Sequence, residues 1–373
     1  MDSGWVPPEF FVSLRKIKDM MTIADFNVTP VDQSKLKDIN LENIPFGKYF
    51  TDHMLEVDFE EGEWKTVEIK PYQPLLLEPS LAAIHYGQSI FEGIKAYKNP
   101  NGEAFIFRPI DNFHRFNQSA RRMQMPEVPE EIFMEGLKTL IGMDQAWIPQ
   151  RTDHSLYIRP FMFSTDHAIG VKPSASYKFM IILSPTGPYY NLPMRIYVEE
   201  KYTRAAPGGV GYAKAAGNYG AAMYASAQAK AKGYDQVLWT DAFEHKYVQE
   251  CGTMNVFFII GNTAITPDLN EGTILEGVTR NSVITVLKEM GFSVEERHLS
   301  IHDIIDAHKA GVLYEVFGTG TAATISLIKE LKYKDYEMKF DVDKWKTAPD
   351  VKNRLNDIRY GLAPDTHGWM FRV

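Results

Sequence analysis

The feature that most constrains the fold is a break near the middle of the chain. Residues 184–193 are Ser-Pro-Thr-Gly-Pro-Tyr-Tyr-Asn-Leu-Pro, with three prolines and one glycine in ten positions. Such a stretch interrupts regular structure and is typical of a linker. A chain of 373 residues is also long for one hydrophobic core, so we expect two domains. We assign an extension at residues 1–20, a small N-terminal α/β domain at 21–186, a linker at 187–199 and a large C-terminal domain at 200–373.

Apolar periodicity on both sides of this break predicts a mixed α/β fold of the α+β kind. Phe113, Phe116 and Ala120 recur at helical spacing, and short apolar runs between turn residues indicate strands. Gly233 is expected to end one helix and Thr279 to N-cap another. We expect helices at 110–123, 130–143, 219–232, 280–290 and 301–310, and strands at 104–107, 155–163, 177–183, 194–199, 236–240, 247–250, 255–260 and 313–317.

Bulk properties exclude several classes of function. The net charge of −8 argues against a nucleic-acid partner, which would favour a basic face. No apolar run approaches the length of a membrane span, and residues 1–20 lack a signal-peptide pattern, so we expect no membrane association. The single cysteine, Cys251, excludes an intrachain disulfide and is compatible with a cytoplasmic location. The histidines lack metal-ligand spacing, so no metal site is expected.

The candidate reactive group is Lys214, which lies in a segment of small residues, Gly208 to Gly220. A lysine amine can form a Schiff base with an aldehyde, and small neighbours leave room for a flat cofactor. Tyr219 follows five positions later, at the entrance to the Ala-rich helix. A flexible loop with an ordinary surface lysine is an equal alternative on this segment alone.

Four other segments carry residues that could complete a site. Glu250 at a strand end could face a buried cation, and Arg115 on a helix could clamp a phosphate. The segment Gly277-Val278-Thr279-Arg280 opens a helix, whose free N–H groups suit a phosphate. The segment Gly318-Thr319-Gly320-Thr321-Ala322 could form an anion-binding nest. Taken singly, a surface glutamate, a solvated arginine and a plain N-cap are the ordinary alternatives.

Together, these segments resemble the branched-chain amino acid aminotransferases, which are pyridoxal-phosphate enzymes of fold type IV. The resemblance extends from about Phe46 to the C-terminal Trp369-Met370-Phe371-Arg372-Val373. Its motifs stand in the family's order at residues 46–54, 85–93, 157–160, 208–220, 250–255 and 318–322. It implies two domains with the active site between them, and pyridoxal 5′-phosphate as the cofactor.

The resemblance also implies a role for each candidate residue. Lys214 would be the Schiff-base lysine, Glu250 would pair with the pyridine nitrogen, and Tyr219 would contact the phenolic oxygen. The phosphate would be held by a cationic side chain and two loops: Arg115, Val278, Thr279, Thr319, Gly320 and Thr321. The Thr321 and Ala322 amides would receive the substrate carboxylate. The side-chain pocket would be lined by Phe46, Tyr86, Phe91, Tyr157 and Thr253, with Arg159 assisting glutamate.

The implied reaction moves an amino group between leucine, isoleucine or valine and 2-oxoglutarate. Its partners would thus be small amino acids and 2-oxo acids. Two other activities of the same fold type, D-amino acid aminotransferase and aminodeoxychorismate lyase, stay open, as does a non-catalytic protein that binds an anion. A homodimer is also implied, in which residues 167–171 of one subunit close the other's pocket. Phe161-Met162-Phe163 and Pro188-Tyr189-Tyr190 offer apolar groups for an interface.

Overall fold

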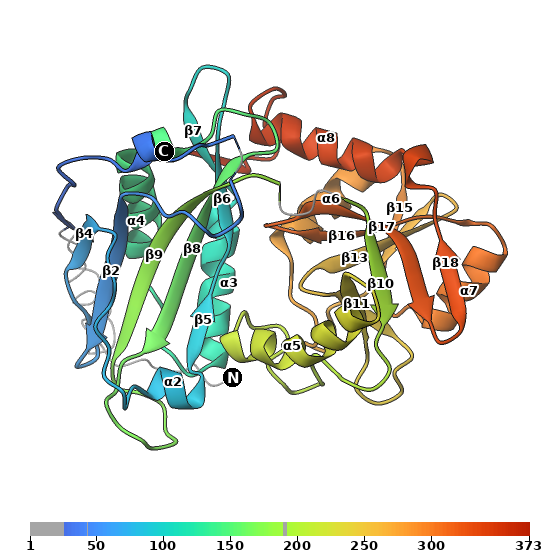
Figure 1. Ribbon diagram of the computed structural model, residues 1–373, viewed down its shortest axis with the longest axis horizontal. Helices are drawn as coiled ribbons and strands as arrows, with labels where there is room; N and C mark the ends of the chain where they lie inside the picture. Colours follow the sequence, from blue (N-terminus) through green and yellow to red (C-terminus); the bar gives the residue numbers. More distant parts are fainter. Residues whose placement is uncertain (1–25, 43, 189–191) are drawn as a thin grey trace, which may run out of the picture.

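The structure is a computed structural model that describes residues 26–42, 44–188 and 192–373. Within these residues the strands form two sheets that lie side by side (Figure 1). The extension expected at residues 1–20 lies outside the described residues. The mixed α/β architecture expected from the sequence is confirmed, and the two sheets belong mainly to the two halves of the chain.

The first sheet has the order β1-β4-β2-β9-β8-β6-β7-β19, with β3 on β2 and β5 on β8. Its strands are β1 (Phe26–Val28), β2 (His53–Glu60), β3 (Glu63–Trp64), β4 (Val67–Pro71), β5 (Ser89–Phe91), β6 (Ile94–Lys98), β7 (Ala104–Phe107), β8 (Ser155–Ser164), β9 (Tyr177–Thr186) and β19 (Met370–Arg372).

Two long antiparallel strands, β8 and β9, form the centre of this sheet. Residues of β9 alternate between two apolar layers: Phe179 and Ile181 face the main core, and Met180 faces a smaller cluster. Helices α3 (Pro109–Arg122) and α4 (Glu130–Met143) cover the main core. Proline at the first position of α3 suits a helix start, because its missing N–H would have no partner there.

The second sheet has the order β12-β11-β10-β17-β16-β13-β14-β15, with β18 on β17. Its strands are β10 (Met194–Val198), β11 (Gln236–Thr240), β12 (Val248–Cys251), β13 (Asn255–Ile260), β14 (Thr263–Thr266), β15 (Ser293–Glu296), β16 (Leu313–Gly320), β17 (Thr324–Tyr333) and β18 (Tyr336–Lys339). The other described α-helices are α2 (Ala82–Tyr86), α5 (Ala216–Ala231), α6 (Val278–Glu289), α7 (Ile301–Lys309) and α8 (Thr347–Arg359).

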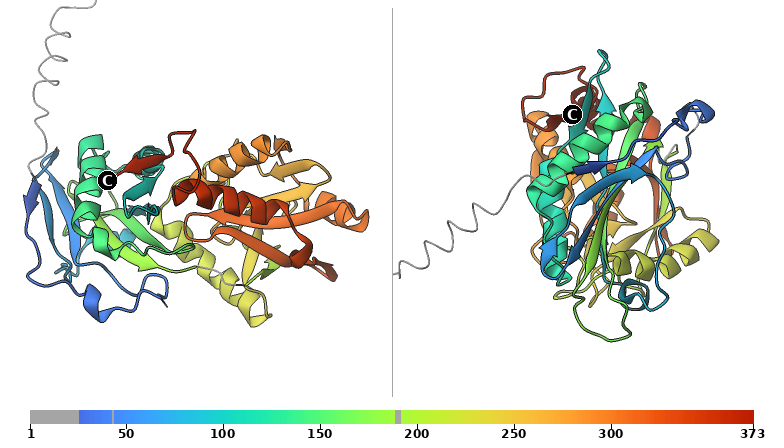
Figure 2. Two further views of the ribbon diagram at one scale, coloured as in Figure 1. Left: turned by 90° about the horizontal axis from the view of Figure 1, so that it is seen from above. Right: turned by 90° about the vertical axis from the view of Figure 1, so that its left-hand side faces the viewer.

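The two halves are joined by a shared core as well as by the connecting chain. One apolar cluster combines Tyr97 and Phe107 of the first half with Phe257, Phe317 and Ile358 of the second. After α8 the chain returns to the first sheet, where β19 pairs with β7. Figure 2 shows this C-terminal segment crossing from one half to the other. The pocket between the sheets therefore has walls that are packed against each other.

The structure corrects several expected bounds. The helix expected at 280–290 begins at Val278, with Gly277 as its N-cap, so Thr279 lies in the first turn and does not cap it. The strand expected to end at Phe317 continues to Gly320. Strand β10 lies inside the expected linker and belongs to the second sheet, and β19 places the chain end in the first sheet. The division into domains itself remains a prediction.

Helix α8 is capped by a carboxylate from a distant strand. Glu315, a buried residue of β16, accepts hydrogen bonds from the backbone N–H groups of Lys346, Thr347 and Ala348, at 2.9, 2.8 and 2.7 Å. The first N–H groups of a helix have no partner within the helix, and a negative charge there is also favoured by the helix dipole. This contact fixes the start of the helix that leads the chain back to the first sheet.

We expect Glu315→Gln to destabilise the protein by about 2 kcal/mol, because the amide is uncharged and its NH2 group meets a backbone donor. The measurement is the midpoint of urea unfolding, followed by circular dichroism. Glu337→Gln, on the exposed strand β18, is the matched control and is expected to leave the midpoint in place. Equal midpoints for the two variants would contradict a capping role for Glu315.

Candidate active site

A cavity of about 570 Å³ lies between the two halves of the molecule. Its wall combines residues of the first half, such as Phe91 and Tyr157, with the segments expected to bind a cofactor in the second. The residues expected from the sequence that line it are Phe46, Phe91, Arg115, Tyr157, Arg159, Lys214, Tyr219, Glu250, Thr253, Val278, Thr279, Thr319, Gly320, Thr321 and Ala322. Tyr86 is the exception, since it does not line this cavity.

The backbone of Lys214 is held by the first half of the chain. Its N–H donates to the Ser119 hydroxyl on α3 at 2.9 Å, and its carbonyl accepts from the Phe91 N–H at 3.1 Å. The neighbours Ala213 and Ala215 are buried in the core of that half. Small side chains are needed here because the segment lies directly against β5 and α3. The lysine therefore has a fixed backbone, and only its side chain extends into the cavity.

The Lys214 amine meets the hydroxyl of Tyr219, 3.0 Å away. Tyr219 lies in the first turn of α5, which begins at Ala216, so five residues of spacing bring the two groups together. The amine also lies 4.9 Å from the centre of the Phe91 ring. Gly211 allows the loop before the lysine to close, because a side chain there would collide with the Thr273 carbonyl. A lysine so placed has one polar neighbour and an apolar wall.

Glu250 provides a buried carboxylate in the same cavity. It lies on β12, accepts from the Leu275 N–H at 3.0 Å and forms an ion pair with Arg204, whose Nε lies 2.8 Å from Oε2. Burial raises the pKa of the Glu250 carboxyl, and Arg204 is the strongest opposing influence, followed by the Leu275 amide. A carboxylate in this position can receive a proton-bearing nitrogen of a ligand.

The third part of the cavity is suited to an anion. Helix α6 begins there, with Gly277, Val278 and Thr279 in the wall, so free N–H groups and the positive end of the helix dipole are available. The Thr319 hydroxyl is buried, lines the cavity and has no hydrogen-bond partner among the described residues. A buried polar atom without a partner is costly, so this hydroxyl points to a polar ligand.

Arg115 also lines the anion end, although it already has a partner. Its Nε and Nη2 donate to the two carboxylate oxygens of Glu92 at 2.7 and 2.8 Å, and Nη1 donates to the Glu276 carbonyl at 2.8 Å. Glu92 is fully buried. The bidentate pair fixes the plane of the guanidinium and offsets its charge. The helix terminus and hydroxyls must therefore supply much of the attraction for a doubly charged phosphate.

The remaining wall is aromatic. The rings of Phe46 and Tyr157 meet edge to face with centres 4.8 Å apart, and the ring of Phe91 packs at 4.7 Å from that of Tyr219. Arg159 lies above the Phe91 ring at 4.5 Å and donates to the Tyr157 hydroxyl at 2.9 Å. This end can therefore bury an apolar side chain beside one cationic group.

Sequence reasoning missed Glu92 and Arg204, the residues that pair with Arg115 and Glu250. Glu92 carries a weak signal, because it is a carboxylate between the apolar Phe91 and Gly93 in one of the family motifs. Arg204 lies ten residues before Lys214 in an irregular segment and has no periodic signal. Ion pairs between distant segments depend on how the chain folds, so neither partner follows from local pattern.

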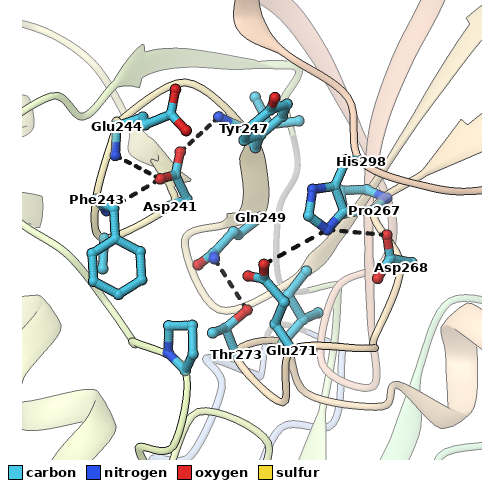
Figure 3. Close-up of a pocket in the computed structure, with 14 residues that line it drawn as sticks. Asp241, Phe243, Glu244, Tyr247, Gln249, Pro267, Asp268, Glu271, Thr273 and His298 are labelled. Atoms are coloured by element: carbon cyan, nitrogen blue, oxygen red, sulfur yellow. Dashed lines mark hydrogen bonds and ion pairs between the residues drawn. The ribbon is translucent and has the colours of Figure 1, made fainter.

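A second, smaller cavity of about 110 Å³ lies near the far side of β12 (Figure 3). Its polar groups largely satisfy one another. Asp241 accepts four backbone N–H groups, from Phe243, Glu244, Lys246 and Tyr247, and Gln249 donates to Thr273. These hydrogen bonds fold the loop between β11 and β12, so we assign this cavity a structural role.

Comparison with known proteins agrees with this geometry. The family described as amino-transferase class IV matches residues 89–331. Branched-chain-amino-acid transaminase 1 of Bacillus subtilis is 50% identical over 337 residues, covering 89% of this chain and 94% of the relative. The branched-chain-amino-acid aminotransferase of Mycolicibacterium smegmatis is 41% identical over 383 residues and covers both chains fully, at 100%.

Solved structures give the same result. The branched-chain amino acid aminotransferase of Escherichia coli superposes with a TM-score of 0.71 at 26% identity, covering 86% of this chain and 98% of that one. The T.th. enzyme, complexed with N-(5′-phosphopyridoxyl)-L-glutamate, superposes with a TM-score of 0.67 at 26% identity, covering 84% and 97%. The expected family and fold are therefore confirmed: this chain belongs to the branched-chain amino acid aminotransferases of the class IV aminotransferase family.

Proposed function

We propose that this chain transfers the amino group between leucine, isoleucine or valine and 2-oxoglutarate, with pyridoxal 5′-phosphate as its cofactor. The observation that carries the proposal is the contact of the Lys214 amine with the Tyr219 hydroxyl, in a cavity that also contains the buried Glu250. Among the described lysines, Lys214 alone lines that cavity. The 41–50% identity to named relatives favours this substrate class over the two alternatives of the same fold type.

The donor groups of the cavity fit the cofactor from end to end. Lys214 would hold its aldehyde carbon, Tyr219 its phenolic oxygen and Glu250 its ring nitrogen. The start of α6, the unpartnered Thr319 hydroxyl and Arg115 would hold the phosphate. When bound, the cofactor supplies a ring that accepts the electrons released at the substrate α-carbon.

The chain's own groups then handle protons and orientation. Lys214, once displaced by the substrate amine, can accept the α-proton and return it, because its fixed backbone keeps Nζ within a small volume. Tyr219 orients that amine through their hydrogen bond. Glu250 keeps a proton on the ring nitrogen as long as the carboxylate itself is ionised, and Arg204 favours that state.

The aromatic wall accounts for both classes of substrate. Phe46, Phe91 and Tyr157 can bury the methyl groups of a branched side chain, at about 0.8 kcal/mol per carbon. Arg159 lies on the same wall and can pair with the second carboxylate of glutamate. The amides of Thr321 and Ala322, in the turn between β16 and β17, are proposed to bind the α-carboxylate that all these substrates share.

We also propose that the enzyme is a homodimer in which Tyr86 serves the partner's cavity. Tyr86 ends the short helix α2 and is 41% exposed, outside the cavity of its own chain. Leu81, just before α2, forms a β-bridge with His167, which places the segment 167–171 beside this helix. Val171 in that segment is 89% exposed. Two segments expected to contact substrate thus form one exposed surface away from their own cavity.

Other supports for the dimer differ in strength. Met162 and Phe163 are buried in their own chain, so core packing accounts for them. Tyr189 and Tyr190 lie outside the described residues. None of the described helices is long and apolar enough to span a membrane. The cytoplasmic location expected from the sequence stays a prediction.

Lys214→Ala is expected to abolish transamination of leucine, isoleucine and valine, because no other lysine of the described residues lines the cavity to replace it. Borohydride reduction of the holoenzyme, followed by peptide mapping, should label Lys214. The unmodified enzyme should prefer each branched substrate over alanine by about tenfold or more in kcat/KM. Lys230→Ala, on the outer part of α5, is the matched control and should keep full activity. A label on another lysine, or alanine as the best substrate, would contradict the proposal.

Arg204→Met is expected to shift the acid limb of the kcat profile to higher pH. Activity needs the ionised Glu250, so it is present above the pKa of that carboxyl and lost as pH falls through it. Burial already raises this pKa, and removal of Arg204 takes away the strongest opposing influence. A shift of about one pH unit corresponds to about 1.4 kcal/mol. Arg195→Met, which removes an ion pair with Glu330 elsewhere, should leave the profile unchanged.

Mixing two inactive variants tests the shared site. Lys214→Ala lacks the amine, and Tyr86→Ala lacks the tyrosine. If Tyr86 acts across a dimer, a mixed dimer contains one site with both residues, and activity returns after the variants are exchanged in mild denaturant. Light scattering should give about twice the chain mass. A monomer with full activity, or mixtures that stay as inactive as their components, would refute this arrangement.

A further inference from the structure

Lys95 is a buried lysine on the cavity side of the first sheet. In register it lies opposite Tyr157, just as Phe91 lies opposite Phe161, so these residues share one face of the sheet. Phe91 and Tyr157 both line the cavity. Lys95 lies further along the same face, where the first sheet meets the turn that follows β16.

The Lys95 amine has one hydrogen-bond partner in the described part of the chain. It donates to the carbonyl oxygen of Ala322 at 3.0 Å, across the boundary between the two halves. The side chain is buried, and within the described residues Lys95 forms no ion pair with a carboxylate. A buried ammonium without an anionic partner is costly and therefore calls for an explanation.

The charges around Lys95 are mainly positive. Arg359 and Lys352 approach from α8, and Asp153 approaches from the loop before β8. Burial is the main cause that lowers the pKa of Lys95 to about 7; the two cations act in the same direction, and Asp153 opposes them. Arg359 is also buried, and its Nε and Nη1 have no hydrogen-bond partner among the described residues. An anion in front of the Ala322 turn would offset this excess of positive charge.

We propose that Lys95 is a positioning residue that holds the turn Thr321–Ala323 so that its amides face the α-carboxylate of the substrate. This inference rests on the proposed function, which places that carboxylate at the turn. A trans peptide unit is planar, with its C=O and N–H on opposite sides. A hydrogen bond from Lys95 to the Ala322 carbonyl therefore turns the Ala323 N–H away from Lys95, and Ala323 itself lines the cavity.

The role is specific to the carboxylate end of the substrate. The Lys95 charge lies behind the turn and attracts an anion in front of it, whereas an apolar side chain is bound elsewhere, at the aromatic wall. The cofactor contacts Lys214, Tyr219 and Glu250, and none of these hydrogen-bonds to Lys95 in the described residues. Loss of Lys95 should weaken carboxylate binding while the cofactor stays in place.

The test compares two ligands that differ only in charge. The acid is 4-methylvaleric acid, with which the related T.th. enzyme forms a complex of known structure. The alcohol is 4-methylpentan-1-ol, which has the same carbon skeleton. Their inhibition constants against leucine are measured with the holoenzyme of the unmodified chain, Lys95→Met and Lys98→Met. Lys98 lies on the same strand, does not line the cavity and is the matched control.

We expect Lys95→Met to weaken inhibition by the acid about tenfold, the size expected for the loss of a charge-assisted hydrogen bond. Inhibition by the alcohol and the cofactor absorbance spectrum should stay close to those of the unmodified enzyme, and Lys98→Met should change neither ligand. Equal weakening of both ligands, or no change in either, would overturn the inference. An unmodified enzyme that does not prefer the acid would refute the carboxylate site itself, before Lys95 is considered.

A second measurement needs no variant and decides the matter if Lys95→Met does not fold. In the unmodified enzyme, the preference for acid over alcohol is followed from about pH 6 to about pH 9, where the acid stays ionised. The Lys95 ammonium carries its charge below its pKa of about 7 and loses it above. The preference should therefore fall as pH rises through about 7. A preference that is constant over this range would overturn the inference.

Discussion

The attachment of the Lys214 backbone to the first half of the molecule is the constraint on which the site depends. One hydrogen bond to Ser119 on α3 and one to Phe91 on β5 hold a segment that belongs, by sequence, to the second half. Without these contacts the lysine would lie on a loop before α5, free to move with it. The site therefore exists only when the two halves are packed together, which the shared apolar core and the returning strand β19 ensure.

Buried charges arranged in pairs define the two ends of the cavity. Arg115 with Glu92, and Glu250 with Arg204, each place one member of the pair in the wall and the other behind it. The rear partner fixes the orientation of the front one and moderates its charge. Lys95 differs, because the described residues include no carboxylate paired with it. That difference is what associates it with an anion arriving from outside.

Much of the fold could be predicted because its elements have strong local patterns. Helix α4 and strands β7, β11 and β13 occur at their expected bounds. Strand β17 and helix α8 have no counterpart in the sequence-based prediction, because mixed polar and apolar residues hide their periodicity until packing selects one face. A glycine takes the place expected for Thr279 as the cap of α6, since the close approach of Asn255 leaves no room for a side chain.

The sequence alone determined which residue types could carry the chemistry, because the motifs around Lys214, Glu250 and the Gly-Thr segment are local and have little freedom to mean anything else in that order. It also determined the family. Only the tertiary structure decided which partners stand behind those residues and that Tyr86 lies outside its own cavity. Such facts depend on contacts between segments far apart in the sequence, such as those of Lys95 and Ala322, and no local pattern encodes which distant segments meet.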